Sequence, residues 1–381
     1  MRIIDTRIRD LVRRIDTAQT ISPTVDRLIK ELVFRLHESC SRPDVASRYA
    51  EYATQTAGPI GKMPIDADGY VVSIDPLEDE DGFIDCWRRY GVVAGRQVVS
   101  PKGCRRTISR IHDMMRRISA GQCVLADSST WQNMPVDSAG VPILTRGFFE
   151  VYHDDALAQL RQALRVYLHF VMIWGRADLW STFDRLGVKL PGHEESKALP
   201  LHVDQNPNVH PGFRTVQGVL ALTDCPAERG TFMAVPGSKS AFGIYGSMAK
   251  NAGEYVELDR AYPEAQQLAD CAQVLPVRSG DIISWDSRTT HANTANLSNE
   301  ARMVAYIAAG PSAENDAAAV AAREDGFATG LGTNVRNALM HASKKPRYTN
   351  PLILQQVRAA EKFSLLGRLL YGKQRYADII K

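Results

Sequence analysis

The sequence predicts a mixed α/β (α+β) protein in which helical segments flank a β-rich centre. Residues 25–36 repeat apolar side chains at the i, i+3, i+4, i+7 spacing of an amphipathic helix. Residues 214–223 and 303–308 are instead rich in β-branched and apolar residues, which favour strands. Beyond about residue 312 the pattern is helical again and begins with an alanine-rich run.

Length and composition are those of an ordinary globular protein. The chain has 381 residues, of which 44% are hydrophobic and 23% are charged. We divide it into an N-terminal helical extension packed on the core (residues 1–80), a central domain (81–311) and a C-terminal helical extension (312–381).

The first half of the chain is expected to hold helices and one extended segment. Residues 78–81 form an acidic run that is interpreted as a solvated turn. An extended segment is expected over residues 90–101. Ser100 and Pro101 then open a helix that runs to about residue 118, because serine caps a helix N-terminus well and proline fits its first position. A second helix is predicted over about residues 154–173.

Two strands are predicted near the middle of the chain. Residues 181–190 read as one strand, whose alternation places Arg185 and Lys189 on the same face. The strand over 214–223 carries a polar residue, Gln217, and a polar side chain that points into a core needs hydrogen-bond partners.

The C-terminal extension is expected to be helical. A longer helix is predicted from Pro351 to near Gly372, and the basic cluster Lys344–Arg347 is interpreted as solvated. Three roles stay open for this extension: it could buttress the central domain, form a dimer contact, or cap a substrate pocket.

Charge and cysteine usage exclude several classes of site and partner. The net charge is +3, and the basic residues form no stripe with aromatic ones, so no nucleic-acid partner is expected. The six cysteines contain no C-x-x-C pair, which argues against a structural zinc site and indicates reduced thiols in the cytoplasm. No export signal is evident, and the most apolar run, residues 166–174, is too short to span a membrane.

A set of possible metal ligands is the most informative feature of the chain. His202 and Asp204 form an H-x-D motif in a loop-like context, and His291 follows the predicted strand 282–285. Two imidazoles and one carboxylate can occupy one face of an octahedral Fe(II) and leave the other face open for substrate and oxygen. Arg302 could hold the far carboxylate of a dicarboxylic cosubstrate. These four residues predict a non-heme iron oxygenase that depends on 2-oxoglutarate.

The order of these motifs resembles that of the phytanoyl-CoA dioxygenase family. Between the H-x-D motif and His291 lie the G-x-x-x-x-x-P-G-S turn of residues 230–238 and the Gly280-Asp281 turn, and Arg302 follows. The resemblance covers roughly residues 83–310. It implies a double-stranded β-helix (jelly-roll) core in the central domain, with Fe(II) and 2-oxoglutarate as cofactors and O2 as a reactant.

Two positions depart from the pattern of the family. Lys239 follows Ser238 where many members have a histidine, but that histidine is not a metal ligand. Asn293 stands where relatives often have serine or threonine, and its amide could still donate to a carboxylate.

The resemblance also implies roles for the polar residues of the predicted strands. Strand 181–190 would line the mouth of the barrel, where Arg185 and Lys189 either reach the cosubstrate or substrate, or face water. Gln217 would either contact the cosubstrate or be satisfied inside the core. The predicted cofactor-binding residues are Arg302, Asn293, Gln217, Lys189 and Arg185.

The predicted reaction is oxidation, foremost hydroxylation, of an unactivated C–H bond in a small molecule, with release of succinate and CO2. Desaturation or cyclisation would use the same residues, whereas halogenation is disfavoured because Asp204 is present. Two other classes stay open. A cupin-type metalloprotein without 2-oxoglutarate would not need Arg302, and a non-catalytic relative would be expected to have lost a ligand.

The substrate itself is not specified by the sequence. Arg185 and Lys189 hint at an anionic group on the substrate, and His210 and Arg214 could also reach the pocket. The long helical extensions hint at a role in secondary metabolism, although ordinary elaboration of the fold explains them equally well.

Overall fold

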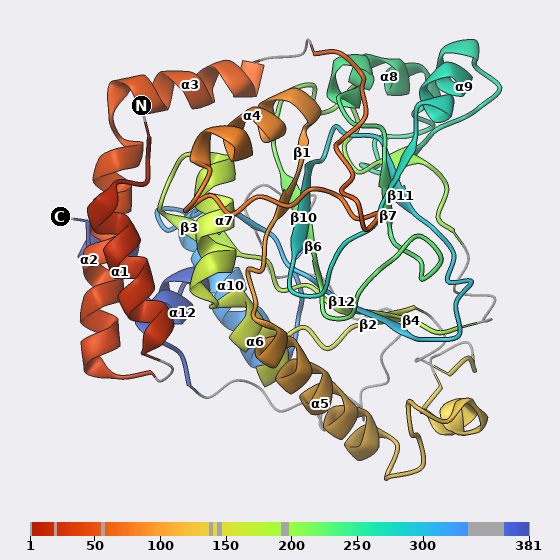
Figure 1. The fold of residues 1–381 in the computed structure, drawn as a ribbon, viewed down its shortest axis with the longest axis horizontal. Coiled ribbons are helices and arrows are strands. Elements are labelled where there is room, and N and C mark those ends of the chain that lie inside the picture. The colour runs from red at the N-terminus through yellow and green to blue at the C-terminus, as the bar shows by residue number, and fades with distance from the viewer. Residues whose placement is uncertain are drawn as a thin grey trace.

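The N-terminal helices and the strands occupy separate regions of the molecule (Figure 1). The computed structural model describes residues 2–18, 21–54, 58–136, 140–142, 147–191, 198–333 and 362–380. In Figure 1 the N-terminal helices lie together on one side, and the strands fill the other side. The fold is mixed α/β with antiparallel sheets, which confirms the coarse prediction from the sequence.

The helices and strands of the described residues have the following bounds. The helices are α1 (Thr6–Thr17), α2 (Pro23–Cys40), α3 (Pro43–Thr54), α4 (Glu80–Tyr90), α5 (Pro101–Ile118), α6 (Asp155–Arg161), α7 (Leu164–Trp174), α8 (Tyr245–Met248), α9 (Pro263–Asp270), α10 (Ala317–Thr329) and α12 (Leu365–Leu370), with the 3-10 helices η1 (Ser128–Asn133), η4 (Ser238–Ile244) and η5 (Tyr376–Asp378). The strands are β1 (Val92–Gly95), β2 (Phe148–Phe149), β3 (Leu179–Ser181), β4 (Leu186–Lys189), β5 (His202–Val203), β6 (Val216–Ala221), β7 (Phe232–Ala234), β8 (Val256–Glu257), β9 (Gln273–Leu275), β10 (Ile282–Asp286), β11 (His291–Asn293), β12 (Arg302–Tyr306) and β13 (Ala309–Pro311).

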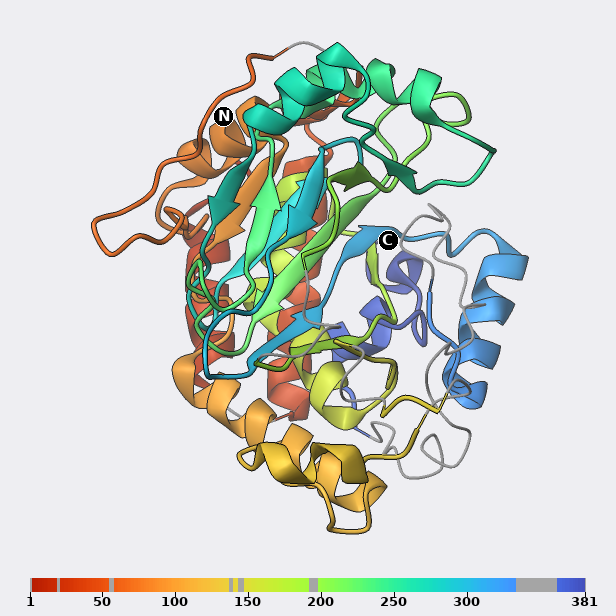
Figure 2. The same ribbon diagram turned by 90° about the vertical axis from the view of Figure 1, so that its right-hand side faces the viewer.

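Two larger sheets and one small sheet are formed by these strands. The larger ones have the strand orders β1-β10-β6-β12-β4-β2 and β8-β5-β11-β7-β9, and β13 pairs with β3. Every pairing between the named strands is antiparallel. Because strands far apart in sequence become neighbours, the sheets bring together motifs that the chain separates (Figure 2).

The two larger sheets pack face to face over an apolar cluster. Val219, Trp285 and Val304 of the first sheet are buried in the same cluster as Phe232 and Leu275 of the second. Side chains alternate along a strand, so the residues that share a face with these five also point into the space between the sheets. That intersheet space is where a polar site can be enclosed.

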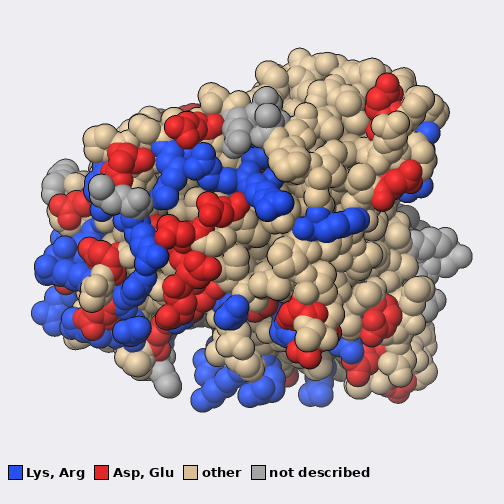
Figure 3. Space-filling model, turned by 45° about the horizontal axis from the view of Figure 1, so that its top comes forward, with Lys and Arg blue, Asp and Glu red and all other residues tan. Residues whose placement is uncertain are grey.

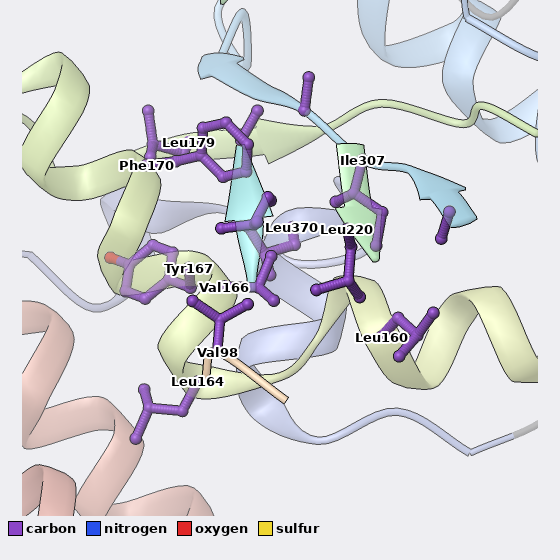
Figure 4. Packing of buried hydrophobic residues seen from close by; sticks show 14 of the residues in the cluster. Val98, Leu160, Leu164, Val166, Tyr167, Phe170, Leu179, Leu220, Ile307 and Leu370 are labelled. Atoms are coloured by element: carbon purple, nitrogen blue, oxygen red, sulfur yellow. The ribbon is translucent and has the colours of Figure 1, made fainter. Parts of the chain in front are cut away.

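The outer face of the larger sheet is covered by α7. Phe170 and Val166 of this helix are buried with Leu220 of β6 and with Ile307, which follows β12 (Figure 4). The run over residues 166–174 is therefore a core helix, as its length indicates. No helix among the described residues is both long and apolar enough to cross a bilayer.

Two predicted helices are confirmed. α2 buries the predicted apolar stripe, including Ile29, Leu32 and Leu36. α5 begins at Pro101 and ends at Ile118, and Ser100 Oγ accepts a hydrogen bond from the backbone N–H of Gly103.

The single helix predicted over about 154–173 is wrong, because the chain forms two helices there. α6 ends at Arg161, and Ala163 is extended (ψ 128°) ahead of α7. The break frees the side chain of Gln162, whose Oε1 accepts from both the backbone N–H and the hydroxyl of Ser364, each at 2.9 Å. A contact with the C-terminal extension thus forms where one continuous helix was expected.

The single strand predicted over 181–190 is also wrong. β3 and β4 belong to different sheets, and residues 182–185 between them lie outside any strand. Their backbone groups bond elsewhere: the Phe183 N–H donates to Thr333 Oγ1, and the Asp184 carbonyl accepts from Arg161. The extended segment expected over 90–101 is likewise shorter, because only Val92–Gly95 forms β1.

The acidic run at residues 78–81 is only partly solvated. Asp79 caps α4, as a turn residue would, but Glu80 is fully buried. Its two carboxylate oxygens accept hydrogen bonds from the backbone N–H groups of Ile3 and Ile4. The expectation of a solvated turn is therefore wrong for Glu80, because its charge is compensated by two backbone donors distant in sequence.

The predictions for the C-terminal extension are only partly covered by the structure. α12 ends just before Gly372, where the predicted helix was expected to end. The first part of that helix and the cluster Lys344–Arg347 lie outside the described residues.

On the face shown in Figure 3, basic and acidic side chains are interspersed.

Leu32→Ala tests how strongly the N-terminal helices contribute to the core. Leu32 is fully buried in the cluster that α2 shares with α7, so we expect the variant to lose about 2–5 kcal/mol of unfolding free energy. Urea denaturation measures this loss. A change below about 0.5 kcal/mol, the size typical of surface substitutions, would show that α2 packs only loosely.

Candidate metal centre

The three predicted ligands meet where β5 lies beside β11. His202 begins β5, His291 begins β11, and the ladder pairs these two residues directly. Asp204 follows β5, and its Oδ2 lies 3.9 Å from His202 Nε2 and 3.6 Å from His291 Nε2. One ligand atom from each residue lies within 4.8 Å of the others, so the three side chains can hold one metal ion.

Both imidazoles are oriented by a backbone carbonyl. His202 Nδ1 lies 2.8 Å from the carbonyl oxygen of Pro200, and His291 Nδ1 lies 2.9 Å from that of Thr289. A carbonyl oxygen only accepts, so Nδ1 carries the proton in each ring. The Nε2 lone pairs are therefore available for a metal, which is the usual arrangement around a metal-bound histidine.

The ligands are buried on one side and approachable on the other. The ring of His291 lies 5.0 Å from Trp285 and 6.2 Å from Phe232, both within the apolar cluster between the sheets. The ring of His202 lies 4.7 Å from Tyr255, which is 40% exposed. The Tyr255 side of the site therefore lies nearer the surface than the Trp285 side.

Gln217 contacts the ligand carboxylate. It shares a face of β6 with Val219, and its Nε2 donates to Asp204 Oδ2 at 2.9 Å. A neutral amide donor at this point orients the carboxylate without competing for the metal through a charge. The sequence named Gln217 as a cofactor-binding residue, and the structure brings it to the metal ligand.

A pair of buried cations lies deeper in the same intersheet space. Arg302 of β12 stands directly opposite Lys189 of β4, and they are 3% and 5% exposed. Arg302 shares a face of β12 with Val304, which belongs to the intersheet cluster. Like charges directly opposite one another destabilise a sheet, so an anion between them would be stabilising.

Arg302 has capacity for such an anion. Among the described residues no carboxylate forms an ion pair with it, and its buried Nε has no hydrogen-bond partner. The guanidinium also interacts with the thiol of Cys225, and an anion would offset the several kcal/mol that desolvation of this buried charge costs. The donor chemistry of the position fits a carboxylate bound in a bidentate pair.

Lys189 links the cation pair to the strand that carries His291. Its Nζ donates to Asn293 Oδ1 and to the carbonyl oxygen of Thr294, the latter at 2.7 Å. Burial, with a smaller contribution from Arg302, lowers the pKa of Lys189 to about 7. The side-chain carbonyl oxygen of Asn293 is thus engaged by Lys189, and the role of Asn293 in cofactor binding stays a prediction.

Arg185 lies apart from this pair. Its guanidinium packs over the rings of Phe148 and Tyr306, at 4.5 Å and 5.6 Å from their centroids. It also lies near Glu150 and Asp184, with N–O distances of 3.7 and 3.6 Å. The structure shows no contact between Arg185 and Arg302 or Lys189, so its predicted role in cofactor binding gains no support from geometry.

His210 and Arg214 are engaged by one carboxylate. His210 Nε2 lies 3.2 Å from Glu254 Oε1, and Arg214 donates to the same oxygen at 2.9 Å. Glu254 therefore compensates the charge of Arg214, which weakens the case for an anionic substrate at this side.

Several site residues were not found from the sequence. Trp285 could have been anticipated, because alternation along β10 puts it on the same face as Ile283, toward the other sheet. No sequence pattern marks Tyr255 or the carbonyls of Pro200 and Thr289 as neighbours of the ligands, since their positions depend on loop geometry.

Removal of either histidine ligand should abolish tight metal binding. We expect His202→Ala and His291→Ala to weaken Fe(II) binding by more than about 100-fold in anaerobic calorimetric titration, because each removes one of three ligands. His210→Ala is the control, since His210 faces Glu254 instead. Equal loss of binding in all three variants would contradict the assignment.

Comparison with known proteins gives a consistent picture. The family model described as phytanoyl-CoA dioxygenase matches residues 87–304. The chain is 24% identical over 250 residues to Ava biosynthesis cluster protein O of Aspergillus versicolor, covering 62% of this chain and 79% of that protein. It is 22% identical over 299 residues to a candidate phytanoyl-CoA dioxygenase of Dictyostelium discoideum, covering 65% and 84%.

The fold also matches a solved structure along almost its whole length. The crystal structure of a hypothetical protein from Escherichia coli gives a TM-score of 0.58 at 15% identity, and the match covers 97% of this chain and 96% of that one. The helical extensions are therefore part of a fold seen elsewhere. With the family match spanning more than half of its length and the ligand set in place, the chain belongs to the phytanoyl-CoA dioxygenase family.

Proposed function

We propose that the protein is a non-heme Fe(II)- and 2-oxoglutarate-dependent oxygenase that hydroxylates an unactivated C–H bond of a small molecule. One observation carries the proposal. The His202, Asp204 and His291 ligand set and the buried cation Arg302 come from facing sheets and share one intersheet space. A metal alone would need only the three ligands, whereas a dicarboxylate that chelates the metal needs the ligands and also a cation for its far carboxylate.

The proposed core is the double-stranded β-helix that the family resemblance implies. Its support is the face-to-face packing of the two larger antiparallel sheets around the site. The proposed domain limits of 81–311 follow from the same core.

The ligand set suits Fe(II). His202 and His291 would bind through Nε2 and Asp204 through its carboxylate, which leaves coordination positions for a cosubstrate and O2. Iron with 2-oxoglutarate and O2 supplies the oxidising power, and succinate and CO2 are the by-products. Because Asp204 is present, a halide has no ligand position to take, so halogenation is disfavoured.

The cosubstrate would be held at its far end by the cation pair. Arg302 offers a bidentate guanidinium, and Lys189 offers an ammonium group from the neighbouring strand. Val304 and Trp285 lie on the faces that line the space between the sheets, so they limit access of water. The protein's own task is therefore to position the reactants and to keep the closed side dry.

The substrate would approach from the side of Tyr255. A small organic molecule fits this side, because the aromatic ring is half exposed and the nearby charges are paired with Glu254. The relative in Aspergillus versicolor belongs to a biosynthesis cluster, which supports a role in secondary metabolism. Desaturation and cyclisation would use the same residues and differ only in how the substrate is placed.

The decisive test is an anaerobic titration with Fe(II) and then with 2-oxoglutarate, read by the visible charge-transfer band of the chelate. We expect the band in the wild type and none in His202→Ala. In Arg302→Ala, Fe(II) binding should persist while 2-oxoglutarate binding weakens by about 100-fold, the loss of one charge-assisted bidentate pair.

Arg110→Ala is the matched control for Arg302, because Arg110 lies on the surface and pairs with Asp155. Iron binding without any band in the wild type would contradict the proposal and favour a metalloprotein without 2-oxoglutarate. If the band forms, succinate release in the presence of candidate compounds identifies substrates.

Binding of 2-oxoglutarate should weaken as the pH rises above about 7. The Lys189 pKa of about 7 means that the ammonium form, which attracts a carboxylate, is lost as pH increases. A bound anion favours the charged form, so binding should take up a proton, and the dissociation constant should rise by up to about tenfold per pH unit.

Calorimetry in buffers of different ionisation enthalpy measures this proton uptake. Lys189→Arg is the control, because a guanidinium stays charged throughout this range. The same pH dependence in that variant would show that another group is responsible.

A further inference from the structure

A buried polar cluster lies directly behind His291. It consists of Tyr52 on α3, Lys239 in η4, Asp286 at the end of β10 and Arg288 in the following turn, and we refer to it as the Tyr52 cluster. Each of the four residues is at most 2% exposed. Neither the metal nor the cosubstrate needs these residues as direct ligands, so the cluster requires another explanation.

Asp286 is the centre of the cluster. Its carboxylate accepts from Arg288 through the backbone N–H at 2.9 Å, through Nε at 3.0 Å and through an NH2 nitrogen at 2.7 Å. An aspartate that binds both the backbone and the side chain two residues ahead fixes the conformation of the turn between them. The guanidinium also packs over the ring of Phe213, 5.5 Å from its centroid.

Tyr52 brings the N-terminal extension into this cluster. Its hydroxyl donates to Asp286 Oδ2 at 2.9 Å, and burial raises its pKa well above the usual value, so it stays a donor. Lys239, the residue at which the P-G-S turn departs from the family pattern, lies over the Tyr52 ring at 4.1 Å from its centroid. Lys239 Nζ donates to the carbonyl oxygen of Arg88 at 2.7 Å.

The turn fixed in this way is the one that orients the ligand His291. The Thr289 N–H donates to the carbonyl oxygen of Asp286 at 2.8 Å, and the Thr289 carbonyl accepts from His291 Nδ1. On the next residue, the Thr290 N–H donates to Ser238 Oγ at 2.8 Å. The direction of the His291 ring therefore depends on the conformation of residues 286–290.

The same turn also reaches the other ligand-bearing segment. Ser287 Oγ donates to Gln205 Oε1 at 2.7 Å, and Gln205 immediately follows the ligand Asp204. Gln205 Nε2 in turn donates to the carbonyl oxygens of His210 and Gly212, each at 2.6 Å. Movement of the turn would thus disturb both strands that supply ligands.

We propose that Tyr52 is a positioning residue of the metal centre, which it supports through its hydrogen bond to Asp286 and the turn that orients His291. The inference rests on the proposed function, since it concerns the same metal. It gives the N-terminal extension a role in the site, because α3 supplies a side chain without which the turn loses one of its fixed contacts. The preference for a donor at this place follows from the buried charge of Asp286, which needs hydrogen bonds on both oxygens.

Tyr52→Phe tests the proposal with the removal of one oxygen atom. We expect the dissociation constant of Fe(II), measured by anaerobic calorimetry, to rise by up to about 10-fold. This is the lower end of the range for groups that hydrogen-bond a metal ligand directly, because Tyr52 acts through Asp286 and the turn. The matched control is Tyr49→Phe on the same helix, whose hydroxyl donates to the carbonyl oxygen of Met172 on α7 and not to a residue of the turn. Thermal unfolding of both metal-free variants measures the purely structural cost.

A rise in the dissociation constant for Tyr52→Phe alone, with similar losses of unfolding temperature in both variants, supports the proposal. Equal dissociation constants in the two variants and the wild type overturn it. Asp286→Asn keeps the shape of the side chain and removes its charge, and it should weaken Fe(II) binding at least as much. Wild-type affinity in Asp286→Asn overturns the proposal even if Tyr52→Phe does not fold. A wild-type protein that binds no Fe(II) overturns the proposed function itself.

Discussion

The metal centre depends on one cross-strand pairing, in which His202 of β5 faces His291 of β11. A slip of one residue in this register would turn one imidazole to the opposite face of its sheet. Both strands are short, with two and three residues, so their own ladder bonds can fix the register only weakly. The contacts that hold it come from outside the strands. β7 pairs with β11 on its far side, and the P-G-S turn holds the backbone just ahead of His291.

The sequence predicts the parts of the site that are fixed by residue type. Two histidines, one aspartate and one arginine have few alternative explanations in this order. The structure groups the histidines with the aspartate, and it places the arginine opposite Lys189 on the facing sheet, where its role stays a prediction. Lys189 and Gln217 were named from strand alternation, and both residues lie in strands of the structure, β4 and β6. Arg185 shows the limit of that reasoning, because it lies between β3 and β4, one residue before β4 begins.

The parts that could not be predicted depend on contacts between distant segments. The break between α6 and α7 is linked to the hydrogen bond that Gln162 accepts from Ser364. The gap between β3 and β4 is linked to hydrogen bonds of its backbone with Thr333 and Arg161. Local sequence carries no information about such partners. The same is true of Glu80, whose burial follows from two backbone donors near the N-terminus. Both extensions also meet each other, since Asp26 of α2 accepts from the Leu365 N–H and from Arg368.

The opposed cations Arg302 and Lys189 have a consequence for the protein as a folded molecule. When Lys189 is protonated, two buried positive charges on adjacent strands repel each other, and its lowered pKa reflects this cost. Relief of this repulsion would be part of the affinity of a dicarboxylate that bound between them, and such binding would stabilise the folded state by about 2.7 kcal/mol at a hundredfold excess over the dissociation constant. Melting temperature then becomes an assay for ligands that does not require a known reaction. In a cell, the same coupling would make the lifetime of the folded chain follow the supply of its dicarboxylate.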